Sequence, residues 1–289
     1  GAGFIGSSVI RALNDKGFNQ ILVIDDLGTD ERWKNLVGKQ FADIIPIKDT
    51  FSYLKGHRKE IQAFIHLGAN SNTWETNASY LLENNYRYSV DLCTYAIENE
   101  VRFIYASSAA TYGDGLLGFD DSHDQIMKLR PLNMYGYSKQ LFDLWALENK
   151  LLDQIVGLKY FNVYGPNEWH KGNMASAIVK FVDSVKEKGE IQLFASNDPD
   201  HYKDGEQSRD FIYIKDVAAI TLKFLQNDVG GIFNVGCGEA ITWNRFAKAV
   251  FKAMNKPEVI KYIPMPKILD GKYQNRTVAD LTKLKRALG

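Results

Sequence analysis

The sequence has little cysteine and no long apolar run. Only Cys93 and Cys237 occur among 289 residues, far apart in the chain, which excludes a disulfide framework and favours a reducing compartment. No run approaches the roughly 20 apolar residues of a membrane-spanning helix. We therefore expect a cytoplasmic protein without a membrane partner.

The sequence also lacks an excess of charge of either sign. It has 35 Lys and Arg against 35 Asp and Glu, so the formal net charge is zero. This balance argues against a generally basic surface for nucleic acid and against a polybasic membrane anchor. The five histidines show no zinc-like spacing among themselves or with the cysteines, so no metal site is predicted.

Short apolar runs alternate with longer amphipathic stretches along the first half of the chain. Most of the runs are nearly continuous, as in parallel strands buried on both faces. The pattern predicts an α/β fold with a Rossmann-type, doubly wound parallel sheet, whose ligands bind beyond the carboxyl ends of the strands. The predicted strands span 21–24, 63–67, 102–105, 155–158 and 231–235, and the predicted helices 6–16, 78–99 and 133–150.

The character of the sequence changes after Tyr164-Gly165-Pro166, where polar, Gly- and Asn-rich segments surround a helical stretch near 175–188. We predict a dinucleotide-binding domain at 1–164 and a smaller, mainly substrate-binding α/β lobe at 165–289. Segments near 209–236 are expected to return to the first domain. Because the sequence opens inside a glycine motif, we expect a first strand before it. Because it stops at Gly289 soon after a helical pattern begins, we also expect a C-terminal helix beyond it.

The opening Gly1-Ala-Gly3-Phe-Ile-Gly6 leads directly into a helical pattern. Gly3 would let backbone amides approach a pyrophosphate at the helix N-terminus, and Gly6 would let the helix pack closely on its strand. Asp25 ends an apolar run at the distance from the glycines where a carboxylate takes a ribose hydroxyl. A structural turn alone would explain the glycines, but not their combination with Asp25, so a dinucleotide site is predicted.

The choice between the two nicotinamide dinucleotides stays open in the sequence. Asp25 would repel a 2′-phosphate and thus favour NAD. Arg32, seven residues further on, could instead hold that phosphate and favour NADP, or could be a solvated loop charge.

Tyr135-Gly-Tyr-Ser-Lys139 lies in a predicted helix, so Tyr135 and Lys139 share one face. A tyrosine with a pKa of about 10 is too weakly ionised at neutral pH to act as a base. Lowering that pKa by about 3 units takes about 4 kcal/mol, which a lysine cation at about 4 Å can supply at an effective dielectric near 20. Tyr135 is therefore predicted to be the acid/base, with Lys139 charging it and binding the nicotinamide ribose.

Small hydroxyl side chains follow the strand predicted at 102–105. Ser107, Ser108 and Thr111 are expected to point into the ligand crevice at its carboxyl end. Ser108 could bond both a substrate oxygen and the tyrosine hydroxyl. A turn rich in small polar residues is the simpler alternative, but the order of the three motifs favours hydride chemistry.

Together these strings resemble the extended short-chain dehydrogenase/reductase family, also called the NAD-dependent epimerase/dehydratase family. GAGFIGS, YASSAATYG and YGYSK are shared by its extended members, whereas HKGNMAS at 170–176 is similar to its ADP-heptose 6-epimerase branch. The resemblance implies an isomerase with a tightly bound NADP, or NAD, that is never consumed. Its substrate would be ADP-D-glycero-D-manno-heptose, a precursor of lipopolysaccharide, and its assembly a homo-oligomer, a pentamer.

The reaction implied by this resemblance is inversion of C6 of the heptose. C6 is not acidic, because no carbonyl adjoins it, so inversion requires transient oxidation to a 6-ketone and reduction on the other face. The resemblance gives Lys171 the second proton-handling role beside Tyr135. Without that resemblance, Lys171 would be read as a solvated loop lysine.

The resemblance also implies two sets of contacts, which we carry over residue by residue. Arg209 makes independent sense as a diphosphate clamp, because a guanidinium bonds phosphate oxygens in pairs. The expected cofactor contacts are Gly3, Phe4, Ile5, Gly6, Asp25, Asp26, Arg32, Lys48, Leu67, Gly68, Ala69, Asn70, Ser71, Asn84, Lys139 and Val163. The expected substrate contacts are Ser108, Asn162, Asn173, Lys180, Phe194, Ala195, Ser196, Asn197, Arg209 and Tyr273.

Three other readings compete with this one. A UDP-sugar 4-epimerase needs the same tyrosine, lysine and serine but no Lys171. A 4,6-dehydratase is less favoured, because residues 107–113 lack the Asp-Glu pair that would eliminate water. A non-catalytic dinucleotide sensor on the same fold would not need the Tyr135–Lys139 motif.

Overall fold

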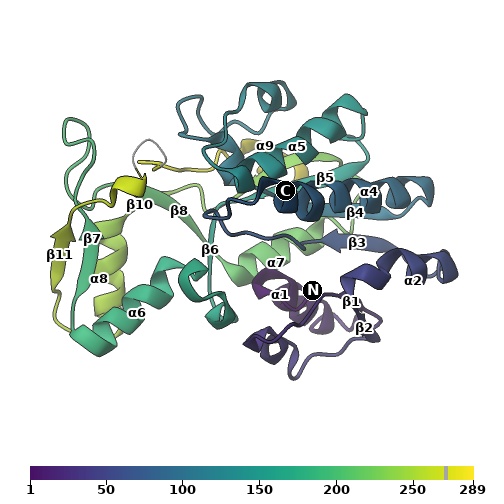
Figure 1. The fold of residues 1–289 in the computed structure, drawn as a ribbon, viewed down its shortest axis with the longest axis horizontal. Helices are drawn as coiled ribbons and strands as arrows, with labels where there is room; N and C mark the ends of the chain where they lie inside the picture. Colours follow the sequence, from purple (N-terminus) through teal and green to yellow (C-terminus); the bar gives the residue numbers. More distant parts are fainter. Residues whose placement is uncertain (270–272) are drawn as a thin grey trace.

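A computed structural model describes residues 1–269 and 273–289 (Figure 1). Its largest sheet has four parallel strands in the order β3-β4-β5-β9, and β1 and β2 form a separate parallel pair. These strands are β1 (Leu22–Ile24), β2 (Asp43–Ile45), β3 (Ala63–His66), β4 (Arg102–Ser108), β5 (Ile155–Tyr160) and β9 (Gly231–Val235). The predicted α/β architecture with parallel strands is confirmed.

Helices cover both faces of the large sheet, as Figure 1 shows. On β4, Phe103 packs with the cluster that contains residues of α4 and α5, whereas Ile104 packs with the cluster that contains residues of α1, α7 and α9. Both faces are therefore apolar, which explains the continuous apolar runs. The helices around this sheet are α1 (Phe4–Asn14), α2 (Thr50–Gly56), α3 (Ala78–Leu81), α4 (Tyr88–Glu98), α5 (Met134–Glu148), α7 (Ile214–Lys223) and α9 (Thr282–Leu288).

Three boundaries differ from the sequence prediction in ways that matter for the site. The helix expected from Gly6 begins at Phe4, so the amides of Phe4 and Ile5 belong to its first turn. The strand expected to end at Tyr105 continues to Ser108. The single helix expected over 78–99 is interrupted between α3 and α4 by a π-helical segment, η3 (Leu82–Arg87).

The second half of the chain adds two small sheets. β6 (Asn162–Tyr164) is parallel to β8 (Ser208–Tyr213), which is antiparallel to β10 (Ala240–Thr242). β7 (Ile191–Phe194) and β11 (Ile260–Ile263) form a parallel pair, on which α6 (Ala177–Lys188) and α8 (Trp243–Ala253) pack around Val185, Val250 and Phe251. The chain then re-enters the large sheet, because β9 pairs with β5.

Short 3₁₀ helices connect the larger elements. They are η1 (Glu31–Leu36), η2 (Ile47–Asp49), η4 (Ala109–Tyr112), η5 (His123–Lys128), η6 (Trp169–Met174) and η7 (Lys267–Leu269). Over residues 1–269 and 273–289, no helix is both long enough and apolar enough to cross a bilayer.

Gly113 fixes the loop that follows η4. Its φ of 65° is unfavourable for other residues, and a Cβ added there would overlap the carbonyl oxygen of Arg130. Gly113→Ala is therefore expected to cost about 3 kcal/mol of folding stability or more, since the clash adds to backbone strain of about 1–3 kcal/mol. Thermal unfolding measures this loss.

Gly118→Ala is the matched control, because Gly118 also has a positive φ (77°) but open space around its missing Cβ. An equal loss in both variants would show that backbone strain alone, and not the approach of Arg130, requires glycine at position 113.

Candidate active site

Tyr135 and Lys139 lie in the first two turns of α5. The Asn133 side chain starts this helix by accepting a hydrogen bond from the Gly136 amide at 2.8 Å. One turn after the half-buried Tyr135, the buried Lys139 donates from Nζ to the Ala106 carbonyl of β4 at 2.8 Å. The ammonium is thus held against the carboxyl end of the central strand.

Ser108, the last residue of β4, joins the tyrosine. Its Oγ accepts the Ala110 amide at 3.1 Å, and its hydrogen bond to the Tyr135 hydroxyl lowers the tyrosine pKa. Burial outweighs this effect and raises the pKa of Tyr135 above its ordinary value. The prediction that Lys139 lowers the pKa of Tyr135 left out this desolvation, which acts in the opposite direction.

Lys139 itself is affected by burial. Desolvation lowers the pKa of its ammonium to about 8, and the nearby Asp143 carboxylate partly opposes that shift. Close to neutral pH, Lys139 is therefore mostly charged but titrates within the range in which enzymes work.

Ser107 and Thr111 do not face the site, in contrast to the sequence prediction. The Ser107 hydroxyl donates to Asp143 at 2.8 Å, and the Thr111 hydroxyl accepts from Lys159 at 2.7 Å. Both are buried. Sequence reasoning missed Asp143 and Lys159, although a lysine inside the apolar strand β5 was a signal that it needed a buried partner.

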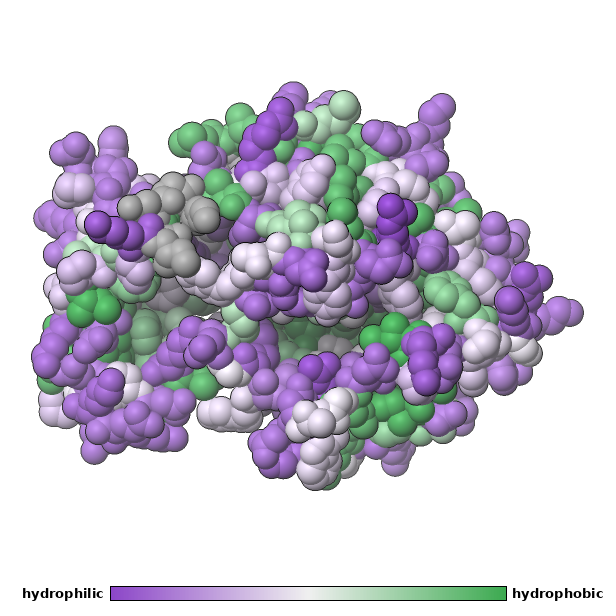
Figure 2. Space-filling view, viewed as in Figure 1, coloured by the Kyte–Doolittle hydropathy of each residue, from purple (hydrophilic) through white to green (hydrophobic). Residues whose placement is uncertain are grey.

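The start of α1 suits a dinucleotide phosphate. Its N-cap residue is Gly3, so no N-cap side chain accepts a hydrogen bond from the first-turn amides. A Cβ added at Gly3 would meet no atom within 4 Å. A Cβ on Gly6 would overlap the Gly1 backbone, so the helix packs closely there. The first-turn amides and the helix dipole are thus available for an anion. Figure 2 shows a hollow on this face, near the start of α1 and the segment after β3.

Asp25 and Arg32 lie side by side next to the glycine motif. Asp25 follows β1 and accepts the Ala2 amide at 2.7 Å, and its other oxygen lies 3.5 Å from the Arg32 guanidinium. Arg32 also pairs with Asp30 at 2.7 Å and keeps about a third of its side chain exposed (35%). Asp25, which is expected to favour NAD, and Arg32, which is expected to favour NADP, therefore lie in contact at the same end of the expected cofactor site.

The segment 67–71 follows β3 at the carboxyl edge of the large sheet. A buried residue of the π-helical segment, Asn85, accepts the Asn70 amide at 2.9 Å and donates to the Asn70 carbonyl at 2.9 Å. It also receives a bond from Asn84 and donates to Ser138 on α5 at 3.0 Å. The sequence predicted a role for Asn84 but not for Asn85, which joins this segment to α5, the helix that carries Tyr135 and Lys139.

The remaining expected cofactor contacts lie around these groups. Asp26 is exposed and accepts the Ile47 amide at 3.1 Å, and the exposed Lys48 follows in η2. Val163 on β6 packs in the same hydrophobic cluster as Phe4 and Ile5 of α1.

Lys171 is not a solvated loop lysine. It lies half-buried in η6, with Nζ 5.2 Å from the centroid of the Phe4 ring at the start of α1. Burial lowers the pKa of its ammonium, and Glu168 opposes this shift. Beside it, the His170 ring and Asn35 lie 3.2 Å apart between nitrogen atoms, and Asn35 donates to the Ala2 carbonyl at 3.1 Å. This loop is therefore anchored on the glycine motif.

Three of the expected substrate contacts meet in an aromatic cluster. The Arg209 guanidinium is buried 4.8 Å from the Tyr273 ring centroid, and Phe194 packs edge-on against Tyr273 at 6.3 Å. Trp243, which the sequence analysis missed, lies 5.7 Å from Arg209 and donates to the Tyr273 hydroxyl at 2.9 Å. Burial lowers the pKa of Arg209, but an arginine stays charged at neutral pH.

The other expected substrate contacts are more exposed. After β7, the Ala195 amide donates to the Ile263 carbonyl and the Ser196 amide to the Asp204 carboxylate, at 2.8 Å each. Asn197, the next residue, is exposed. Asn162 is exposed on β6. Asn173 and Lys180 line one pocket at the start of α6.

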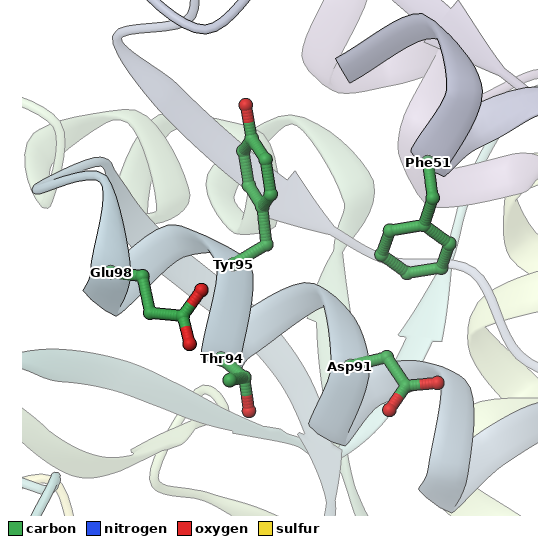
Figure 3. A pocket seen from close by; sticks show the side chains of 5 residues that line it. All are labelled: Phe51, Asp91, Thr94, Tyr95 and Glu98. Atoms are coloured by element: carbon green, nitrogen blue, oxygen red, sulfur yellow. The ribbon is translucent and has the colours of Figure 1, made fainter. Parts of the chain in front are cut away.

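A second pocket lies away from all of these residues. Figure 3 shows it between α2 and α4, with Phe51 on one helix and Asp91, Thr94, Tyr95 and Glu98 on the other. None of its side chains is among the predicted contacts, so it carries no part of the catalytic argument.

Comparisons with known proteins show which family the chain resembles. The model of the NAD dependent epimerase/dehydratase family matches residues 1–236. The chain is 52% identical to a Nitratidesulfovibrio vulgaris protein named ADP-L-glycero-D-manno-heptose-6-epimerase, over 99% of this chain and 90% of that protein.

Two solved structures are similar in fold. The ADP-L-glycero-D-manno-heptose-6-epimerase of Helicobacter pylori has a TM-score of 0.77 and 27% identity, over 96% of this chain and 90% of that one. The UDP-N-acetylglucosamine 4-epimerase of Methanobrevibacter ruminantium has a TM-score of 0.81 and 25% identity, over 98% and 88%. These matches confirm the family that the motifs predicted, and the chain belongs to the NAD dependent epimerase/dehydratase family.

Proposed function

We propose that this protein inverts C6 of the heptose in ADP-D-glycero-D-manno-heptose, using a bound nicotinamide cofactor. The observation that carries the proposal is the 52% identity, over nearly the whole chain, to a protein named for that reaction. The geometry supports it, because a second ammonium, that of the half-buried Lys171, lies at the start of α1. The product would serve as a precursor of lipopolysaccharide.

The described residues fit a nicotinamide dinucleotide. The amides at the uncapped start of α1 would hold the phosphates, Asp25 and Arg32 would hold the adenosine ribose, and Lys139 would bond the nicotinamide ribose. When bound, the nicotinamide accepts a hydride and returns it.

The side chains of this protein handle the proton. Tyr135, aligned by Ser108, takes the proton of the C6 hydroxyl as the hydride leaves, which gives a 6-ketone. Burial raises the pKa of Tyr135, and in this proposal the Lys139 cation would offset part of that cost by favouring the phenolate. When the ketone presents its other face and the hydride returns to C6, the Lys171 ammonium gives its proton to the C6 oxygen, and the inverted alcohol forms.

Arg209 and its aromatic neighbours hold the ADP group in this proposal. A buried guanidinium beside two aromatic rings is desolvated in advance, so it binds a diphosphate strongly. Phe194, the last residue of β7, packs on Tyr273. In this proposal Ala195, Ser196 and Asn197, which follow it, and Asn162, Asn173 and Lys180 complete the substrate contacts.

A UDP-sugar 4-epimerase is the second candidate, because the Methanobrevibacter ruminantium structure has the higher TM-score of the two. Incubating the purified protein with ADP-D-glycero-D-manno-heptose and, separately, with UDP-galactose decides between them. We expect inversion of the heptose and bound nicotinamide in the absorbance spectrum. Inversion of UDP-galactose alone would overturn the proposal.

We further propose that NADP is the preferred cofactor, held at its 2′-phosphate by Arg32. Charge-assisted hydrogen bonds contribute about 1.5–3 kcal/mol, so Arg32→Ala should weaken NADP binding by about 10- to 100-fold and leave NAD binding nearly unchanged. Cofactor titration of the stripped protein measures both affinities.

Arg11→Ala is the matched control, because Arg11 also pairs with an aspartate, Asp15, but on the exposed surface of α1. An equal loss of NAD and NADP affinity in Arg32→Ala would show that Arg32 does not read the 2′-phosphate.

A further inference from the structure

A buried ion pair lies directly behind the proposed catalytic residues. Lys159 on β5 and Asp143 on α5 approach to 2.6 Å between Nζ and Oδ2. Their side chains are 2% and 0% exposed. Neither residue belongs to the expected cofactor or substrate contacts, and no step of the proposed reaction uses them.

Hydroxyl groups surround the pair and satisfy its charges. Asp143 accepts from the Tyr105 hydroxyl at 2.9 Å and from the Ser107 hydroxyl at 2.8 Å. Lys159 donates to the Thr111 hydroxyl at 2.7 Å and lies 5.3 Å from the Tyr112 ring centroid.

Stability alone is a weak explanation for such a pair. Taking two charges out of water costs several kcal/mol per ion, and apolar residues of similar volume often replace a buried pair without loss of stability. A buried, fully bonded network can instead fix one arrangement of the elements that it joins.

The elements joined by this network carry the catalytic side chains. Asp143 lies one turn after Lys139 on α5. Its partner Ser107 precedes Ser108 on β4, and Thr111, the partner of Lys159, donates to the Ser108 carbonyl at 2.8 Å. The network therefore bonds to the Ser108 backbone on β4 and also to α5, the helix that carries Tyr135.

We propose that Asp143 and Lys159 are positioning residues, which hold α5 against the β4–η4 segment so that Tyr135, Ser108 and Lys139 stay aligned. The inference rests on the proposed catalytic role of these three residues. Catalysis depends on such alignment steeply, since a displacement of about 1 Å can cost about 100-fold in rate.

The pair also has an electrostatic consequence for Lys139. Asp143, on the same helix, is the charged group that shifts the pKa of Lys139, and His66 on β3 is the neighbour whose own pKa Lys139 lowers. His66 is uncharged, because burial lowers its pKa to about 3. Asp143 raises the pKa of Lys139 against the effect of burial. Without Asp143, Lys139 would lose its proton at a lower pH.

The first test uses the holoenzyme with both charges removed, as Asp143→Leu with Lys159→Met. We expect a melting temperature close to that of the wild type, unchanged cofactor binding and a kcat about 100-fold lower. The alkaline limb of the kcat/KM profile should move to lower pH. The single variant Lys159→Arg, which keeps the positive charge beside Asp143, should retain most of the wild-type turnover. Wild-type kcat in the folded double variant would overturn the proposal, and so would a lowered kcat with an unmoved alkaline limb.

The second test keeps the ion pair and cuts its connection to Ser108. Thr111→Val removes the hydroxyl that bonds both Lys159 and the Ser108 carbonyl. Thr221→Val is the control, because Thr221 is equally buried and bonded, to Tyr160 and Val217, away from this network. We expect similar melting temperatures for the two variants and a kcat loss of about 10-fold in Thr111→Val only. Equal kcat values in the two variants would contradict the positioning role.

These outcomes are separate from the fate of the proposed function. If the wild type inverts UDP-galactose and not the heptose, the substrate assignment fails. The same variants are then compared on UDP-galactose, and the ratio of each variant to the wild type still decides the positioning role.

Discussion

Replacing Tyr135 by phenylalanine is expected to lower kcat for C6 inversion by about 1000-fold while the cofactor stays bound. General acid–base catalysis contributes roughly 100- to 10,000-fold. In this proposal Tyr135 is the hydroxyl that takes the substrate proton, and Ser108, the other hydroxyl that reaches the substrate oxygen, has no lysine to assist it. The cofactor contacts at α1, Asp25 and Arg32 are untouched by the change. Single-turnover kinetics with the heptose, together with the nicotinamide absorbance of the purified variant, measure the two effects.

Tyr137→Phe is the control for this experiment. Tyr137 lies two residues further on the same helix, but its side chain points to solvent and is 45% exposed. It should keep wild-type turnover. Turnover close to wild type in Tyr135→Phe would remove Tyr135 from the mechanism, and a loss of bound cofactor would turn its role into a structural one.

The parts of the site that the sequence predicted are those set by local geometry. A glycine before a helix and two side chains four residues apart on a helix have nearly the same arrangement in any fold. Gly3, Tyr135 and Lys139 therefore lie as expected, and the parallel sheet follows from apolar runs buried on both faces.

The error at Ser107 also has a local cause. Side chains alternate between the two faces of a strand, so Ser107 and Ser108 cannot both point the same way once β4 extends through Ser108. The predicted strand ended at Tyr105, and both serines were expected to point into the ligand crevice. The longer strand sends Ser107 to Asp143 and leaves Ser108 with Tyr135.

The features that the sequence could not predict depend on contacts between distant segments. Asp143 of α5 meets Lys159 of β5, and Trp243 of α8 meets Tyr273, 30 residues further along the chain, only through tertiary packing. The pKa of Tyr135 is a further case. Whether this pKa is raised or lowered depends on how much water surrounds the phenol, and the spacing of residues in the sequence does not reveal that.

Lys171→Met is expected to lower the rate of C6 inversion by about 100-fold and to leave the melting temperature nearly unchanged. Methionine keeps an unbranched side chain that can pack on the Phe4 ring, so mainly the charge and its proton are lost. Losing a general acid or base costs at least about 100-fold. Rates with the heptose and thermal unfolding of the holoenzyme measure both quantities.

The species that builds up in a single turnover distinguishes a catalytic Lys171 from a lysine that only contributes charge to its loop. If Lys171 serves only one presentation of the C6 oxygen, the variant should still oxidise the substrate once through Tyr135, and reduced nicotinamide should build up in a single turnover. Lys186→Met, on the exposed face of α6, controls for loss of a lysine charge. Equal inversion rates in the two variants would return Lys171 to the role of a surface lysine. The half-buried position over Phe4 and the lowered pKa of the ammonium argue for the opposite result, because an ammonium partly stripped of water gives up its proton more readily than a solvated one.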